Sequence, residues 1–465
     1  MVACITVWAL IALSALAIGC AILRTNSETL ETRGDRLVVA LWCGLLTLGL
    51  AALLLAAVTP ISAAVAAFTV FAPFLLLASR RTLSTALGLL SPQALVLGLV
   101  LAVGAGLYVA QPVSFYDTGL YHYQLVSWLT QAGLVPGPSL LHGRLGMQSS
   151  WFSLTALVDH GPLQSRTAGV MGTLALCLCI GHLASILPRW FHGTASNSSR
   201  FLAAGYAMVI PPAIWWDLPN SLAPDWPIWI VTLLCSWLLF HAGEMRQSPK
   251  LAFLLACLSM GLKLSAIPLL LVTSAALAFS QTAKRRDYLW AATVLLAGTV
   301  PGVLSRLLVT GCPFFPSAVG CSSIMQGQVA GHHQQLIADW ARWGHEAPEG
   351  ARILDWLAVW FTHGDKAFIV GLASVSAVVL LVLRFFRTFP GSFWAASLGL
   401  FGLLFLMLTA PNPRFGLGYF IIPPAILIAL LSRRWNKQMA ALVGSTPKIH
   451  GPIRSSTIDV VLAAS

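Results

Sequence analysis

The chain has 465 residues, of which 57% are hydrophobic and only 9% are charged. Soluble globular proteins carry roughly 25% charged residues, so this composition excludes a soluble globular protein and a disordered chain. The formal net charge of +12 does not point to a nucleic-acid reader, because apolar runs of about 20 residues, each long enough to span a membrane, take up most of the chain.

The apolar runs predict an all-α fold, a polytopic transmembrane helical bundle with about 11–14 spans. They show no alternation with a period of two, and a helix satisfies its own backbone hydrogen bonds in lipid. The runs lie at 2–23, 37–58, 61–78, 89–110, 166–187, 200–215, 224–241, 251–265, 266–280, 288–308, 367–383, 392–410 and 417–431.

The basic residues predict the orientation of the spans, because loops on the cytoplasmic side are enriched in Lys and Arg. With the N-terminus outside, most of the 27 basic residues fall in inside loops or in the C-terminal tail. We therefore expect an integral protein of a bacterial inner or plasma membrane, in contact with membrane lipids, with its C-terminus in the cytoplasm and no nucleic-acid partner.

The spans divide the chain into N-terminal transmembrane helices over 1–88, a transmembrane core over 89–431 and a cytoplasmic tail over 432–465. Two outer loops, 111–165 and 309–366, are too long to be simple turns. Chemistry, if the protein performs any, is expected on this outer face.

The first outer loop opens with a dense polar stretch, YDTGLYH, at 116–122. Apolar residues then recur at helical spacing until Gly133, which predicts an amphipathic helix lying at the membrane interface. Asp117 falls at the start of this helix, with Tyr116 and His122 close by. Asp117 fits both a helix N-cap and a catalytic carboxylate held at the membrane surface.

The same loop continues with HGRLG at 142–146. His142 and Arg144 form a small cationic group between glycines, and Arg presents a bidentate fork to phosphate oxygens. The alternative is an interfacial Arg whose charged end reaches the headgroups. Because Arg144 shares its loop with Asp117, we favour a substrate-binding role.

Three later positions are also candidate binding residues. Asp225 follows a proline at the start of a span, which is typical of a helix start. Lys263 interrupts an apolar hairpin, where placing a lysine mid-membrane costs roughly 2.5–3.5 kcal/mol. We therefore expect it to face a cavity, a carboxylate or a phosphate, and snorkelling toward the interface is its alternative. Arg414, next to prolines in the last outer turn, is a candidate anion clamp, and interfacial anchoring is its alternative.

No spacing of His, Cys, Asp or Glu matches a strong metal-binding motif, so no metal ligand and no certain cofactor are predicted. Asp217 and Asp225 in one short outer loop leave a divalent metal open, and His332, His333 and His345 form only a weak pattern. Cys312 and Cys321, close together in the second outer loop, are either a disulfide or two free thiols.

These segments resemble a group of bacterial multi-pass membrane proteins with a YDTGLYH…VPG…HGRLG pattern, here at 116–122, 135–137 and 142–146. The arrangement is similar to the GT-C superfamily of membrane glycosyltransferases, in which a carboxylate lies in a helical first long outer loop. Two features differ from that superfamily: the loop follows the fourth expected span, and Asp117 has no adjacent acid.

The resemblance implies an enzyme that moves a hexosyl or pentosyl unit from a polyprenyl-phosphate-linked sugar to an envelope glycan or lipid acceptor, on the non-cytoplasmic face. Asp117 would be the general base, and Arg144, Lys263 and Arg414 would stabilise the leaving phosphate. His122 or Asp225 would orient the acceptor or the sugar.

Three other functions remain open from the sequence. A polymerase or ligase of lipid-linked glycans would use the same outer-leaflet substrate through its arginines. A transporter or flippase would show polar residues along its spans and inverted repeats, whereas Lys263 is nearly alone and no repeat is visible. A non-catalytic membrane protein would tolerate replacement of Asp117.

Overall fold

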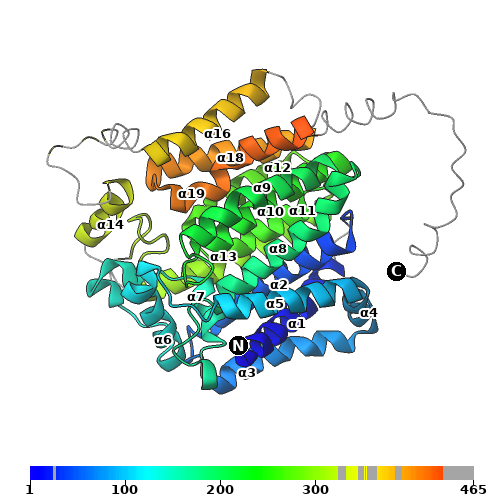
Figure 1. Cartoon of the computed structure of the whole chain (residues 1–465). Helices are drawn as coiled ribbons and strands as arrows, with labels where there is room; N and C mark the ends of the chain where they lie inside the picture. The colour runs from blue at the N-terminus through cyan, green and yellow to red at the C-terminus, as the bar shows by residue number, and fades with distance from the viewer. Residues whose placement is uncertain are drawn as a thin grey trace, which may run out of the picture.

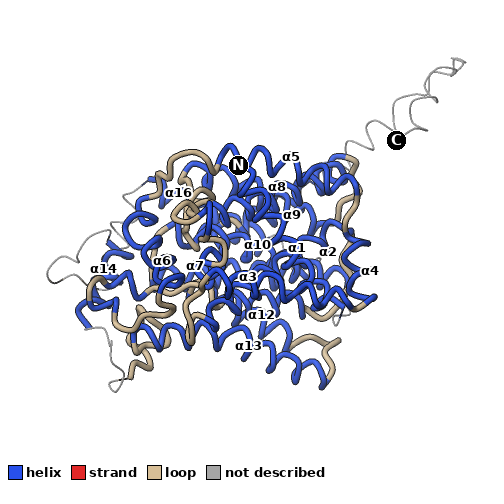
Figure 2. Tube along the Cα trace, turned by 90° about the horizontal axis from the view of Figure 1, so that it is seen from below, coloured by secondary structure: helices blue, strands red, loops and turns tan. Residues whose placement is uncertain are grey.

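The computed structural model describes residues 1–24, 28–322, 331–343, 350, 352, 355, 364–382 and 390–432. Within these ranges every regular element is helical and no strand is present (Figure 2). The all-α prediction is therefore confirmed. The expected tail, 432–465, lies outside the described residues except for its first residue.

The chain opens with a tightly packed helical hairpin, α1 (Val2–Arg24) and α2 (Arg33–Leu55). A Cβ added at Gly19 would lie 1.9 Å from the Ala40 carbonyl oxygen, and one at Gly44 would lie 1.9 Å from that of Ala15. Small residues let helix backbones approach closely where the lipid gives little hydrophobic drive for association. The two glycines therefore set the distance between α1 and α2.

Most of the remaining helices lie in the apolar runs or in the two long outer loops of the sequence. Up to the middle of the chain they are α3 (Ala63–Phe71), η1 (Ala72–Ala78), α4 (Arg80–Leu89), α5 (Pro92–Tyr108), η2 (Thr118–His122), α6 (Tyr123–Gln131), η3 (Pro138–Leu140), η4 (Gly143–Gly146), α7 (Ser150–Ala156), η5 (Gly161–Leu163), α8 (Val170–Phe191) and α9 (Asn197–Trp215). They continue with α10 (Asp225–Met245), α11 (Lys250–Ser259), η6 (Leu264–Ala266), α12 (Ile267–Ala278), α13 (Arg285–Thr310), α14 (Gly331–Trp343), α16 (Gly364–Val382), α18 (Pro390–Thr409) and α19 (Pro413–Phe420).

Seven of the described helices are long and apolar enough to cross a membrane, or eight if the bent pair Ala63–Ala78 and Arg80–Leu89 forms one broken span. Four shorter apolar helices, of 10–17 residues, occupy positions at which we expected full spans: Pro92–Tyr108, Lys250–Ser259, Leu264–Ala278 and Ala367–Val382. The chain is an integral membrane protein in which several of the expected spans are short or broken helices.

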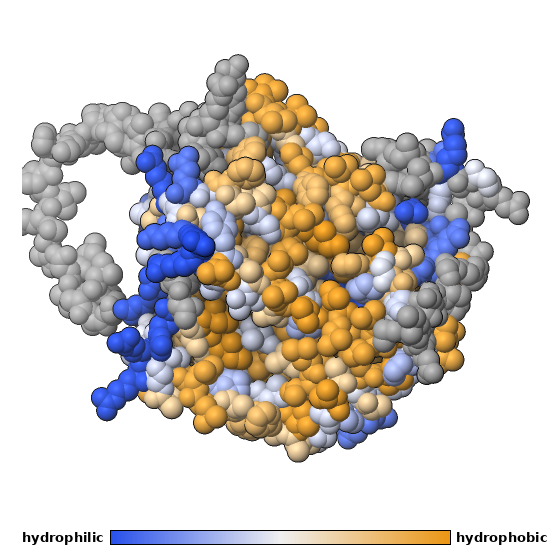
Figure 3. Space-filling view, turned by 180° about the vertical axis from the view of Figure 1, so that it is seen from behind, coloured by the Kyte–Doolittle hydropathy of each residue, from blue (hydrophilic) through white to orange (hydrophobic). Residues whose placement is uncertain are grey.

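The helices of the bundle run roughly side by side, with α10 in the middle (Figure 1). In the apolar stretch of α10, 83% of the residues are buried, because neighbouring helices surround it, whereas in that of α13 only 33% are buried. Figure 3 shows a broad apolar surface on one face, with hydrophilic residues gathered at its two ends. This is the pattern of a membrane-embedded bundle with two polar ends.

One end of the bundle carries the first long outer loop, including η2, α6, η4 and α7 (Figure 1). The expected interfacial helix begins with a π-helical turn, η2, and continues as α6. The chain leaves α6 at Gly133, whose φ of +79° suits glycine. Near the end of α13, Cys312 and Cys321 form a disulfide, which decides between the two alternatives left open by the sequence.

Candidate functional site

Asp117 lies at the start of η2, where its side chain is turned into the protein and only 6% of the residue is exposed. The carboxylate makes no capping hydrogen bond to the helix, so the N-cap alternative does not hold. Instead, Oδ1 accepts a hydrogen bond from Nη1 of Arg144 at 3.1 Å, and Oδ2 pairs with Nη2 of Arg414 at 2.9 Å. Each carboxylate oxygen therefore faces a different guanidinium.

Arg144 is presented by the short 3-10 turn η4. The Nδ1 atom of His142 accepts a hydrogen bond from the Arg144 backbone N–H at 3.3 Å, which caps the turn. A Cβ added at Gly146 would lie 2.8 Å from Cγ2 of Thr310 and 2.9 Å from Cε1 of Phe315. Because only glycine fits there, η4 packs closely on the end of α13 and holds Arg144 beside Asp117.

Asp225 and Lys263 form the second ion pair of the site. Asp225 is the first residue of α10 and is 3% exposed, and Oδ1 accepts a hydrogen bond from Nζ of Lys263. Lys263 lies in extended backbone where α11 has ended and η6 has not begun. The break in the hairpin places the ammonium at the start of α10, so the expected carboxylate partner of Lys263 is Asp225.

Arg414 joins the two pairs into one network. Its guanidinium binds Asp117, and its Nε lies 3.4 Å from Oδ2 of Asp225, an ion-pair distance without hydrogen-bond geometry. The side chain of Asn412 caps α19 by accepting from the Arg414 backbone N–H at 3.0 Å. The Arg414 carbonyl accepts from Nε1 of Trp229 at 2.8 Å, so α10 fixes the position of the arginine.

Aromatic rings cover the cations of this network. The guanidinium carbon of Arg414 lies 5.1 Å from the Phe115 ring centroid and 4.9 Å from that of Phe415, and Nζ of Lys263 lies 3.9 Å from the latter. Rings in this position attract cations and limit water. The guanidinium carbon of Arg144 lies 5.9 Å from the ring centroid of Tyr121 and 5.8 Å from that of Trp340.

His122 is buried beside the network among aromatic rings. Its ring centroid is 4.3 Å from Tyr121 and 5.2 Å from Phe152. Burial, together with nearby cations, lowers the pKa of His122 to about 3, so the imidazole is neutral near pH 7. Its Nδ1 is buried and has no hydrogen-bond partner among the described residues.

The structure therefore brings five of the sequence-predicted residues into one network: Asp117, Arg144, Asp225, Lys263 and Arg414. A sixth, His122, lies next to this network. His142 is exposed and acts on the backbone of Arg144. Tyr116 is 75% exposed and makes no hydrogen bond to the network among the described residues.

Asp217, considered with Asp225 in the sequence, lies apart from the network. Its Oδ1 accepts from the hydroxyl of Tyr108 at 3.0 Å, and its Oδ2 accepts from the backbone and hydroxyl of Ser114 at 2.9 Å and 2.7 Å. Its φ of +53° is the left-handed region. Asp217 therefore closes a loop, and the two aspartates do not form a metal site together.

The sequence patterns did not identify Phe115, Phe415 or Tyr121 as residues of the site. Phe115 lies two residues before Asp117 and Phe415 follows Arg414 directly, so adjacency to a candidate charge was the available signal. The side chains of His332 and His333, and the whole of His345, lie outside the described residues. The weak metal pattern of these histidines remains a prediction.

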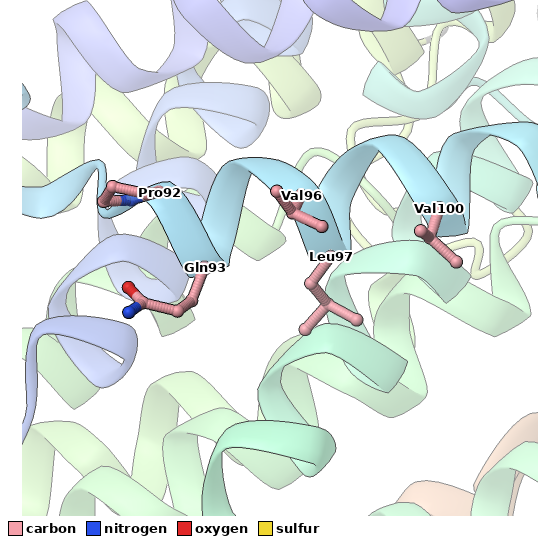
Figure 4. A pocket seen from close by; sticks show the side chains of 5 residues that line it. All are labelled: Pro92, Gln93, Val96, Leu97 and Val100. Carbon is pink, nitrogen blue, oxygen red and sulfur yellow. The ribbon is translucent and has the colours of Figure 1, made fainter. Parts of the chain in front are cut away.

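A hollow elsewhere on the molecule offers no competing site. It is lined by one face of α5, with Pro92, Gln93, Val96, Leu97 and Val100 along it (Figure 4). Its wall is almost wholly apolar, and Val96 and Val100 are more than 60% exposed. A shallow apolar surface of this kind on a membrane helix is suited to lipid chains rather than to chemistry.

The network can bind an anion. Three cations and two carboxylates give it a net formal charge of +1, in surroundings where most of each carboxylate is buried. Guanidinium forks and an ammonium are the groups that bind phosphate oxygens in proteins. A divalent metal is disfavoured here, because both carboxylates already face cations.

Comparison with curated proteins and with solved structures finds no match to this chain. A family model described as a domain of unknown function, DUF8201, matches residues 1–421. The match takes in every residue of the network described above. The chain therefore belongs to the DUF8201 family.

Proposed function

We propose that the protein is a membrane glycosyltransferase that moves a sugar from a polyprenyl-phosphate donor to an envelope glycan or lipid acceptor. The observation that carries this proposal is the position of Asp117 between Arg144 and Arg414. A base and a phosphate site lie side by side there, as transfer from a sugar phosphate requires.

The reaction breaks the bond between the sugar C1 and the phosphate oxygen, and forms a bond between C1 and the acceptor oxygen. The phosphate leaves with the bonding electron pair, and the acceptor proton passes to Asp117. The Nδ1 of His122, which is buried and unpartnered, accepts a hydrogen bond from a hydroxyl of the sugar or acceptor. A single displacement of this kind inverts the configuration at C1.

The charges of the network match both ends of this reaction. A polyprenyl-phosphate sugar carries one negative charge, which balances the net +1 of the site. After transfer the lipid phosphate carries two negative charges. Protonation of Asp117 at the same time raises the site to +2, so the leaving phosphate is neutralised as its charge develops.

Donor binding also prepares the base. In the structure both oxygens of Asp117 are engaged by guanidinium groups, so neither faces an acceptor hydroxyl. Phosphate oxygens compete for the same two groups. A donor that draws Arg144 and Arg414 towards its phosphate leaves Asp117 freer to accept a proton, so activation of the base is coupled to occupancy of the site.

On this proposal the site faces the outside of a bacterial inner or plasma membrane, with the N-terminus outside and the C-terminus in the cytoplasm. The excess of basic residues in the loops at the opposite end supports this orientation. Donor and acceptor then meet at the outer leaflet.

The test replaces Asp117 by Asn in cells that lack the native copy, with envelope glycans profiled by mass spectrometry. We expect loss of one sugar from a glycan at normal protein abundance. Asp217→Asn is the matched control, because it makes the same change outside the network and should leave the glycans intact. Unchanged glycans in Asp117→Asn at full abundance would remove Asp117 as the base.

The two arginines also suit a polymerase or ligase of lipid-linked glycans, which needs the anion site without a carboxylate base. In that case Arg144→Gln and Arg414→Gln would abolish the glycan product, while Asp117→Asn would retain it. A transporter or flippase, or a non-catalytic membrane protein, predicts that no glycan changes its composition in any of these variants.

A further inference from the structure

A second polar cluster lies at the far end of α10 from Asp225. One potential ligand atom from each of Glu31, His241 and Glu244 lies within 4.8 Å of the others. His241 and Glu244 are three residues apart on α10, and Glu31 belongs to the linker between α1 and α2. At 1.5 Å per residue, His241 is about 24 Å along the helix axis from Asp225, so this cluster is separate from the network.

His241 is held with one ring nitrogen free. The residue is 4% exposed, and its Nε2 lies 2.9 Å from the carbonyl oxygen of Thr29. A carbonyl only accepts, so Nε2 carries the proton and Nδ1 keeps its lone pair. Nδ1 is buried and has no hydrogen-bond partner among the described residues. Metal-binding histidines are oriented in the same way, with the other nitrogen donating to a carbonyl.

Glu244 carries a charge that no basic group within ion-pair distance balances in the described part of the chain. Its Oε1 accepts from Nδ2 of Asn197 at 2.9 Å, and its Oε2 accepts from the backbone N–H of Ser198 at 3.1 Å. Asn197 is 5% exposed, and its Oδ1 is buried without a partner among the described residues. A second unpartnered atom, this one an oxygen, therefore lies in the amide that binds the carboxylate.

Glu31 is the exposed member of the cluster. Its Oε2 accepts from Nη1 of Arg189 at 2.8 Å and from the hydroxyl of Ser199 at 2.9 Å, whereas no described residue binds Oε1. Two carboxylates and one guanidinium leave this group of side chains with a net charge of −1. A divalent cation changes the net charge of this group from −1 to +1 and binds the lone pairs that have no partner.

The linker that carries Glu31 is already fastened to the end of α10. The backbone N–H of Thr29 donates to Oε1 of Gln247 at 2.7 Å, and Nε2 of Gln247 donates to the Thr29 hydroxyl at 2.9 Å. These bonds hold Glu31 near His241 and Glu244. The three ligands are thus positioned by contacts that do not themselves involve a metal.

We propose that Glu31, His241 and Glu244 bind a divalent transition-metal cation. An imidazole with two carboxylates suits zinc and related ions rather than magnesium, which prefers oxygen ligands alone. Asn197 Oδ1 or water completes the coordination. The bound cation fixes the α1–α2 linker to the end of α10 and so joins the N-terminal hairpin to the core of the bundle.

The test uses the purified full-length chain in detergent, stripped with EDTA and then incubated with ZnCl2 or MgCl2. After desalting, elemental analysis should find about one zinc per chain. At a zinc concentration well above Kd, the melting temperature should rise by about 3 °C, and magnesium should give no rise. A chain that retains no zinc and shows no saturable shift would overturn the proposal.

Glu244→Gln and Glu31→Gln should each lose the retained zinc and the zinc-dependent shift, measured against the same variant without metal. The glutamates are chosen because His241 is buried, and its removal would also disturb packing. His192→Ala, at an exposed position after α8, is the matched control and should bind like wild type. A shift that persists in both glutamine variants would place the zinc elsewhere and refute this site.

Discussion

Asp225 and Lys263 should be strongly coupled in stability, and a double-mutant cycle measures this coupling. Asp225→Asn leaves Lys263 without its carboxylate, and Lys263→Met leaves Asp225 with only the Nε of Arg414, at 3.4 Å and without hydrogen-bond geometry. Removing one partner of a buried pair typically costs about 3–5 kcal/mol, because the other charge stays buried and uncompensated.

The magnitude of the coupling follows from the exposure of the pair. Two unit charges in contact interact by about 4 kcal/mol at an effective dielectric constant of about 20. The Asp225 side chain is 4% exposed, but that of Lys263 is 27% exposed, so solvent screens part of the attraction. We expect each single variant to lose about 2–3 kcal/mol, and the coupling energy to be about 2 kcal/mol.

The assay is reversible unfolding of the detergent-solubilised chain by SDS, with the free energy of unfolding measured for wild type, both single variants and the double variant. The double variant should lose about as much as either single variant alone. Losses that add to within about 0.5 kcal/mol would refute the pairing, because residues without a shared interaction behave additively.

Two further predictions concern the geometry and protonation of the site. Gly146→Ala should destabilise the protein by about 1–3 kcal/mol and impair glycan synthesis, because its Cβ would lie 2.8 Å from Thr310 Cγ2 and displace the turn that carries Arg144. Gly119→Ala is the control and should be tolerated, because no atom lies within 4 Å of the added Cβ. Equal melting temperatures of the two variants would contradict the close packing of η4 on α13. The pKa of His122 falls from 6.5 in the unfolded chain to about 3 in the folded protein, so its contribution to stability is complete above pH 6.5 and is lost, by up to about 1.4 kcal/mol per pH unit, as the pH falls towards 3. Melting curves between pH 7.5 and 5.0 should therefore show a flatter pH dependence for His122→Gln than for wild type, and parallel curves would show that His122 is not buried in its neutral form.

The sequence alone predicted the fold class of the protein and singled out the charged residues that form the network. Long apolar runs in a chain with 9% charged residues predict helices in lipid. A helix is the one structure in which a single segment makes all of its backbone hydrogen bonds internally. The same scarcity of charge made Asp117, Lys263 and Arg414 conspicuous. A polar residue beside or within an apolar run carries a cost that calls for a partner.

Tertiary structure decided which charges meet. Asp117 pairs with Arg414 across nearly three hundred residues of the chain. Asp225 pairs with Lys263, 38 residues later, whereas its sequence neighbour Asp217 binds Tyr108 outside the network. It also decided that Cys312 and Cys321 are joined and that Glu31 lies beside His241 and Glu244. Local sequence encodes the hydrophobicity and the helix ends, whereas the partner of a charged side chain depends on how distant helices pack, which no local pattern records.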